Sequence, residues 1–129
     1  MKKLFVSVPM KGRTEAEIKE TMEKMKKIAE IYEGEELEMI DSYIEHEPPQ
    51  NSNQGIWYLG ESLKKLSEAD VFIGIDAAWD WSGCDIETST ARAYGIKLHV
   101  VDAESVIPNY AEIVKKRYEE VKAVCPKPY

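Results

Sequence analysis

Short apolar runs alternate along the chain with segments in which apolar residues recur every three or four positions. The runs are KLFVSV (3–8), LEMIDSYI (37–44), VFIGID (71–76) and IKLHVVDA (96–103). Continuous apolar runs of this length predict strands that are covered on both faces, as in a parallel sheet. The sequence therefore predicts four buried strands.

Amphipathic helices are predicted between and after these strands. The first begins after Thr14 and runs to about Tyr32, and Gly34 ends it. Its apolar stripe consists of Ile18, Met22, Met25, Ile28 and Ala29. A polar loop (45–55) precedes a second helix (56–70), which is expected to turn Trp57, Leu59, Leu63 and Leu66 inward. A third helix follows the segment WDWSG, and a fourth covers about 110–124.

The alternation of strands and helices predicts a three-layer α/β/α sandwich of the flavodoxin or Rossmann type. Its sheet is expected to be mostly parallel, with about four or five strands, and residues 1–129 to form a single domain. In such sheets ligands bind outside the carboxyl ends of the strands. Three segments (7–12, 45–55 and 77–85) are therefore expected along one rim.

Composition narrows the function classes. The chain has 129 residues, 43% of them hydrophobic, and a formal net charge of −7, which disfavours binding to nucleic acid or to anionic membranes. Two cysteines and two distant histidines suggest no disulfide scaffold and no metal site. The amino-terminal apolar run is too short for a signal peptide, and no stretch reaches membrane-spanning length. We expect a cytoplasmic protein without cofactor or metal.

The segment WDWSGCDIE (79–87) admits two interpretations. Ser82 and Asp85 have the spacing of a capping box, and acidic residues near a helix start, such as Asp85 and Glu87, gain from the helix dipole. Capping alone accounts for these residues.

Capping leaves the preceding residues Trp79, Asp80 and Trp81 unexplained. The two tryptophans are suited either to flanking a flat ring or to packing against a partner subunit, and the backbone amides near Ser82 and Gly83 can hold an anion.

The segment SVPMKGR (7–13) also has two interpretations. Pro9 and Gly12 can simply form a tight turn beside an exposed Lys11, or the segment can be a phosphate loop after the first strand. It matches neither the dinucleotide fingerprint nor the P-loop pattern. Cys84 near a helix start is a conceivable nucleophile, but no histidine is placed by the sequence to act as its base.

Three stretches together resemble the nucleoside 2-deoxyribosyltransferase-like superfamily, particularly its small bacterial and phage members. LFVSVPMKG (4–12) is similar to the family's opening strand and loop, often written YISGPMTG. LSEADVFIGID (66–76) is similar to the family's third strand and the end of the helix before it. The most specific stretch is WDWSGCDIETSTARAYGIKLHVV (79–101), which resembles W-E-x-S-x-G-A-x-x-E-x-x-x-A-x-x-L-G-I-P-V. The superfamily also includes deoxynucleoside-monophosphate N-glycosidases.

This resemblance implies a function and a set of site residues. Glu87 matches the nucleophile that attacks C1′ of a 2-deoxyribosyl group, as in a retaining glycosidase. The other residues implied to contact substrate are Ser7, Pro9, Met10, Lys11, Gly12, Trp79, Trp81, Ser82 and Gly83. The implied ligand is a nucleoside or nucleotide, and a homodimer or higher homo-oligomer is expected.

The chain departs from the family pattern at two positions. Phe5 stands where active members commonly carry tyrosine, and Ser62 stands where they carry the acid that protonates the leaving base. Glu61 and Asp80 are the candidate replacements for that acid. We therefore predict an enzyme of weak or narrow activity. The alternatives are a nucleotide-binding or sensing protein on the same scaffold, or an interaction protein whose tryptophans form an interface.

Overall fold

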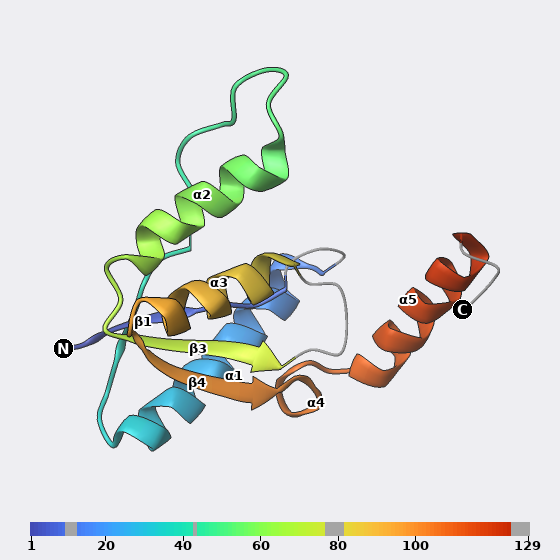
Figure 1. The fold of residues 1–129 in the computed structure, drawn as a ribbon. Coiled ribbons are helices and arrows are strands. Elements are labelled where there is room, and N and C mark those ends of the chain that lie inside the picture. Colours follow the sequence, from blue (N-terminus) through green and yellow to red (C-terminus); the bar gives the residue numbers. More distant parts are fainter. Residues whose placement is uncertain (10–12, 43, 77–81, 125–129) are drawn as a thin grey trace.

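The computed structural model describes residues 1–9, 13–42, 44–76 and 82–124 (Figure 1). The described elements are β1 (Lys3–Val6), α1 (Glu15–Glu33), β2 (Glu38–Met39), α2 (Gln54–Leu66), β3 (Val71–Asp76), α3 (Ser82–Ala93), β4 (Lys97–Asp102), α4 (Ala103–Val106) and α5 (Tyr110–Val124). The predicted alternation of strands and helices is confirmed.

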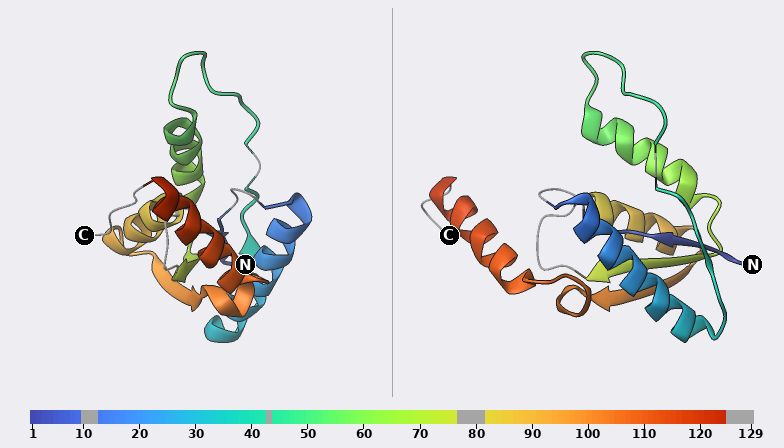
Figure 2. Two further views of the ribbon diagram at one scale, coloured as in Figure 1. Left: turned by 90° about the vertical axis from the view of Figure 1, so that its right-hand side faces the viewer. Right: turned by 180° about the vertical axis from the view of Figure 1, so that it is seen from behind.

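The four strands form one parallel sheet in the order β2-β1-β3-β4. Side chains alternate between the faces of a strand, so Leu4 and Val6 join a core with α1, whereas Phe5 joins Leu66 of α2 and Ala91 of α3 on the other face. Figures 1 and 2 show α1 on one side of the sheet and α3 on the other. The predicted three-layer sandwich is therefore confirmed.

The second strand is much shorter than predicted. It spans only Glu38–Met39, at one edge of the sheet, where Lys3 and Leu4 of β1 are its partners in register. Pairing ends with the hydrogen bond from Ile40 N to Leu4 O (2.8 Å), and the exposed Asp41 and Ser42 follow. An edge strand has a neighbour on one side only, so an apolar run alone does not fix its length.

The helix ends show how local chemistry sets their limits. Thr14 and Glu17 form a reciprocal capping box at the start of α1, and Gly34 ends the helix with a φ of 70°. Asn53 caps α2, so this helix begins before the predicted residue 56. It ends at Leu66 rather than at 70, where the Asp70 carboxylate instead accepts a hydrogen bond from Lys3 N (2.8 Å).

Two features of the carboxyl-terminal half complete the fold. The short helix α4, which was not predicted, follows β4 directly, and its first turn is capped by the Asp102 carboxylate. The predicted last helix is confirmed as α5. Among the described residues, no helix combines the length and the apolar character needed to cross a membrane.

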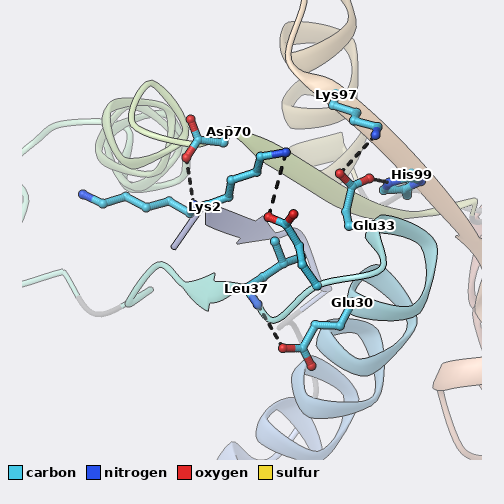
Figure 3. A network of polar contacts seen from close by, with 9 residues as sticks. Lys2, Glu30, Glu33, Leu37, Asp70, Lys97 and His99 are labelled. Carbon is cyan, nitrogen blue, oxygen red and sulfur yellow. Dashed lines mark hydrogen bonds and ion pairs between the residues drawn. The ribbon is translucent and has the colours of Figure 1, made fainter.

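A polar network ties α1 to the amino-terminal ends of the strands (Figure 3). The Glu33 side chain is only 2% exposed and accepts from His99 Nε2 (2.6 Å) and Lys97 Nζ (3.1 Å) of β4. The hydrogen bond with His99 is the main cause that lowers the pKa of Glu33. Lys97 lowers it further, and burial acts in the opposite direction. Tyr32 stacks on the His99 ring, with centroids 5.1 Å apart. The end of α1 is thus fastened to β4 by an ionised carboxylate.

Glu33→Gln is expected to lower the free energy of unfolding at pH 7 by about 1–3 kcal/mol, because it removes the charge from a buried hydrogen-bonded group. The lowered pKa means that the contribution of Glu33 is complete above the ordinary glutamate pKa of about 4.3 and fades as the pH falls through the folded-state value. Urea unfolding at several pH values should therefore show a gap between wild type and variant that narrows on acidification.

The matched control is Glu35→Gln, two residues further along. Glu35 pairs with Lys2 at 3.9 Å on the surface, so its loss should cost less than about 1 kcal/mol. Equal effects of the two substitutions at pH 7 would contradict the role assigned to Glu33.

Candidate active site

Glu87 is a buried acidic residue near the carboxyl-terminal ends of the strands. It lies in the second turn of α3, the helix that follows β3, and is only 8% exposed. Ser7, just beyond β1, donates a hydrogen bond to Glu87 Oε1 (2.7 Å). Ser62 of α2 donates to Glu87 Oε2 (2.6 Å). Three elements distant in sequence therefore meet at one carboxylate.

The strand geometry explains why Ser7 reaches this carboxylate. Ser7 N donates to Ile73 O (2.9 Å), so β1 stays beside β3 beyond its last assigned residue. Ser7 stands two residues after Phe5, and positions two apart share a face of a strand. Phe5 stacks on Phe72 on the face covered by α2 and α3. The serine hydroxyl therefore points toward these two helices and toward Glu87.

Gly74 of β3 allows α3 to lie close to the sheet. A Cβ atom at this position would lie 2.7 Å from Phe72 Cε1 and 3.0 Å from Oγ1 of Thr88, the neighbour of Glu87. The first distance is shorter than real side chains tolerate, so any larger residue would force α3 or Phe72 to move. The missing side chain thus helps to set the height of Glu87 above the strands.

Burial is the main influence on the pKa values of the two buried ionisable groups in this part of α3, Glu87 and Cys84. Burial is the main cause that raises the pKa of Glu87, and the hydrogen bonds from Ser62 and Ser7 act in the opposite direction. Burial likewise raises the pKa of Cys84 to about 11. A thiol with that pKa is almost entirely neutral at neutral pH, which argues against Cys84 as a nucleophile. Glu87 is the more suitable reactive group.

On α2, the contact with Glu87 is made by Ser62 and not by the neighbouring Glu61. The Glu61 carboxylate lies 2.9 Å from Lys64 Nζ on its own helix. Adjacent helical residues point about 100° apart, which accounts for this difference. The family resemblance had marked position 62 only as the place of a missing acid, and that resemblance was the one sign in the sequence that Ser62 faces the site.

The other predicted site residues are described to different extents. Pro9 is buried just after Ser7, and Gly83 is exposed in the first turn of α3. Ser82 begins α3, but its side chain is outside the described part, so its capping box with Asp85 stays a prediction. Outside the described residues altogether are Met10, Lys11, Gly12, Trp79, Asp80 and Trp81.

The arrangement supports chemistry by a carboxylate. Within residues 1–9, 13–42, 44–76 and 82–124, no three His, Cys, Asp or Glu side chains gather in a way that could hold a metal ion. Among the described residues, each oxygen of Glu87 accepts one hydroxyl hydrogen bond, and a carboxylate oxygen has two lone-pair directions. The carboxylate is therefore oriented, yet still able to act as a nucleophile or a base.

Comparisons of the chain with protein-family models, with curated proteins and with solved structures found no match.

Glu87→Gln is expected to raise the melting temperature at pH 7. Because the folded-state pKa of Glu87 is raised, the protonated form favours folding, and stability falls as the pH rises from the ordinary pKa of about 4.3 through the folded-state value. Glutamine resembles the protonated acid and removes this penalty. Thermal unfolding at pH 3.5 to 8 should show a stabilisation that vanishes at the acidic end.

Asp85→Asn provides the control on the same helix. Asp85 is exposed in the first turn of α3, where a negative charge is stabilised by the helix dipole, so its removal should cost up to about 1 kcal/mol. A Glu87→Gln variant that melts lower than wild type at pH 7 would mean that Glu87 serves mainly as a helix-start residue.

Proposed function

We propose that the protein cleaves or transfers at the N-glycosidic bond of a nucleoside, deoxynucleoside or nucleoside 5′-monophosphate, with Glu87 as the nucleophile. The observation that carries this proposal is a buried carboxylate held by Ser7 and Ser62 at the ligand-binding edge of a parallel sheet. The resemblance of residues 3–101 to the nucleoside 2-deoxyribosyltransferase-like superfamily suggests the substrate class.

In the proposed first step, an oxygen of the ionised Glu87 attacks C1′ of the sugar. The bond between C1′ and the base nitrogen breaks, the base leaves with the electron pair, and a glycosyl ester forms through a transition state with oxocarbenium character. Ser7 and Ser62 keep both carboxylate oxygens in a fixed orientation while the charge on them falls. Water or a second base then attacks C1′ and releases Glu87.

The departing base needs a proton, and Glu61 and Asp80 are the proposed donors. The hydroxyl of Ser62, which contacts Glu87, is a far weaker acid than a carboxyl group and is poorly suited to this step. The same observation favours the alternative function, a nucleotide-binding or sensing protein with little or no catalysis. Turnover separates these two proposals, whereas an interaction protein would bind no nucleotide.

We also propose that the protein forms a homodimer or a higher homo-oligomer and acts in the cytoplasm. Figure 2 shows the amino-terminal end of α2 extending away from the sheet, and two large apolar side chains there are exposed, Ile56 at 68% and Tyr58 at 41%. Exposed apolar side chains close to a candidate site are compatible with a subunit contact. Light scattering and sedimentation measure the oligomeric state directly.

Incubation with a panel of nucleosides and 5′-monophosphates, read by chromatography for released base, tests the proposal. We expect weak or narrow turnover that falls at least about 100-fold in Glu87→Gln, while ligand affinity measured by calorimetry is largely retained. A variant that keeps most of the turnover would show that Glu87 is not the nucleophile. Binding of one or more of these nucleosides or monophosphates with no released base would favour the sensing function.

Ser62→Asp is expected to raise the turnover rate by at least about tenfold, since general acid catalysis contributes on the order of 10²–10⁴-fold. An aspartate at this position would stand beside Glu87, and two neighbouring carboxyl groups tend to share a proton. The same chromatographic assay measures the gain. Ser62→Asn, which cannot donate in this way, is the control. Glu61→Gln separately tests whether Glu61, which pairs with Lys64, is the native donor.

A gain in Ser62→Asp that Ser62→Asn reproduces would point to shape rather than to proton donation. No gain in a folded, ligand-binding Ser62→Asp variant would contradict the idea that a missing acid limits this protein.

A further inference from the structure

Arg13 forms a polar junction just before α1. Its guanidinium donates from Nη2 to Thr21 Oγ1 (2.6 Å) and to Glu17 O (3.2 Å) on α1, and from Nη1 to Pro9 O (3.4 Å). Thr21 is fully buried and donates in turn to Val106 O (3.2 Å). One side chain thus links the segment after β1 to α1 and, through Thr21, to α4.

The position of Pro9 gives this junction its relevance. Pro9 and Arg13 flank residues 10–12 in the sequence, and the guanidinium joins these two flanking residues through the hydrogen bond to Pro9 O. Pro9 is two residues beyond Ser7, and the intervening Val8 is packed in the core with α1. A constraint on Pro9 is therefore transmitted over a short, buried stretch to the residue that holds Glu87 Oε1.

Arg13 is held at an energetic cost. Within the described residues its Nε atom is buried without a hydrogen-bond partner, and burial is the main cause that lowers its pKa. A buried unpaired donor is destabilising, so this residue is not explained as an ordinary surface charge. The planar guanidinium reaches Pro9 O from one nitrogen and Thr21 Oγ1 from another, which a single ammonium group cannot reproduce in the same geometry.

We propose that Arg13 is a positioning residue, which fixes Pro9 against α1 and thereby holds the Ser7 hydroxyl on the Glu87 carboxylate. The coupling is mechanical rather than electrostatic. Apart from burial, the charges among the described residues that act on Arg13 are those of Glu17 and Glu20, and the groups that act on Glu87 are Ser62 and Ser7. Its catalytic importance rests on the function proposed for Glu87, but the contact itself can be tested without turnover.

The test is a carbon-13 NMR titration of the ligand-free full-length protein with labelled glutamate side chains, in which Glu87→Gln assigns the Glu87 signal. The Ser7 hydrogen bond lowers the pKa of Glu87, so Ser7→Ala should raise it. Arg13→Lys keeps the positive charge but loses the planar fork, and it should raise the pKa of Glu87 in the same direction by a smaller amount. Other titratable groups on α2 and α3 need controls. Cys84, whose pKa is raised to about 11, does not titrate near neutral pH. The influence of the exposed Asp85 and of Glu61, which pairs with Lys64, is measured with the variants Asp85→Asn and Glu61→Gln.

A double-mutant cycle identifies the route of the effect. If Arg13 acts through Ser7, then Arg13→Lys causes no further rise once Ser7→Ala is present. The same rise in both backgrounds would overturn the proposal, as would an unchanged titration in a folded Arg13→Lys variant. Arg92→Lys, the same exchange at the exposed end of α3, is the control and should change nothing.

Thr21→Val serves as the second variant should Arg13→Lys not fold. It removes the hydroxyl that receives the shortest Arg13 hydrogen bond and leaves Arg13 itself in place. The pKa of Glu87 should again rise, and again only while Ser7 is present. A rise that is independent of Ser7 would overturn the proposal. A positive cycle in a protein without turnover would leave Arg13 as a positioning residue and refute only the proposed catalysis.

Discussion

The carboxylate of Glu87 is buried, its hydrogen-bond partners among the described residues are two hydroxyl groups, and much of the surrounding structure serves that arrangement. A charged carboxylate in such a place is destabilised by the loss of hydration, and two neutral donors offset this only in part. For them to reach it, β1 must continue beside β3 as far as Ser7, and α3 must lie close over Gly74. A fold selected for stability alone has no need of this group, so the arrangement is evidence for function.

The two ends of the sheet treat a buried acid in opposite ways. At the amino-terminal ends of the strands, Glu33 meets Lys97 and His99, and its pKa is lowered. At the carboxyl-terminal ends, Glu87 meets only hydroxyl groups among its recorded partners, and its pKa is raised. The first arrangement stabilises the ionised form and joins α1 to β4. In the second, no cationic partner of the carboxylate is found among the described residues. Glu87 thus lies at the end of the sheet where ligands generally bind in parallel α/β folds.

The sequence predicted the central strands and the capped helices well, because buried apolar runs and capping residues act locally. The run at 71–76 and the helix that begins after Thr14 are examples. It overestimated the second strand, whose length depends on how far β1 offers pairing, and it missed α4, a single capped turn. Glu87 was identified through a resemblance, whereas its contacts with Ser7 and Ser62 span 80 and 25 residues and depend on packing. Arg13 was not singled out because a basic residue after a turn gives no sign of partial burial.

The place of β1 in the sheet has a consequence for how the chain is made. Leu4 pairs with Met39 on one side and with Val71 on the other, so β1 is synthesised before both of its partners and yet becomes an inner strand. At about 5–20 residues per second, the ribosome needs several seconds to supply its second partner. During that interval the apolar segment around Leu4, Phe5 and Val6 has at most the two-residue β2 beside it. Until β3 is available, α1 is therefore the element that can cover this strand. Its residues Met22, Met25 and Ala29 pack in the same core as Leu4 and Val6.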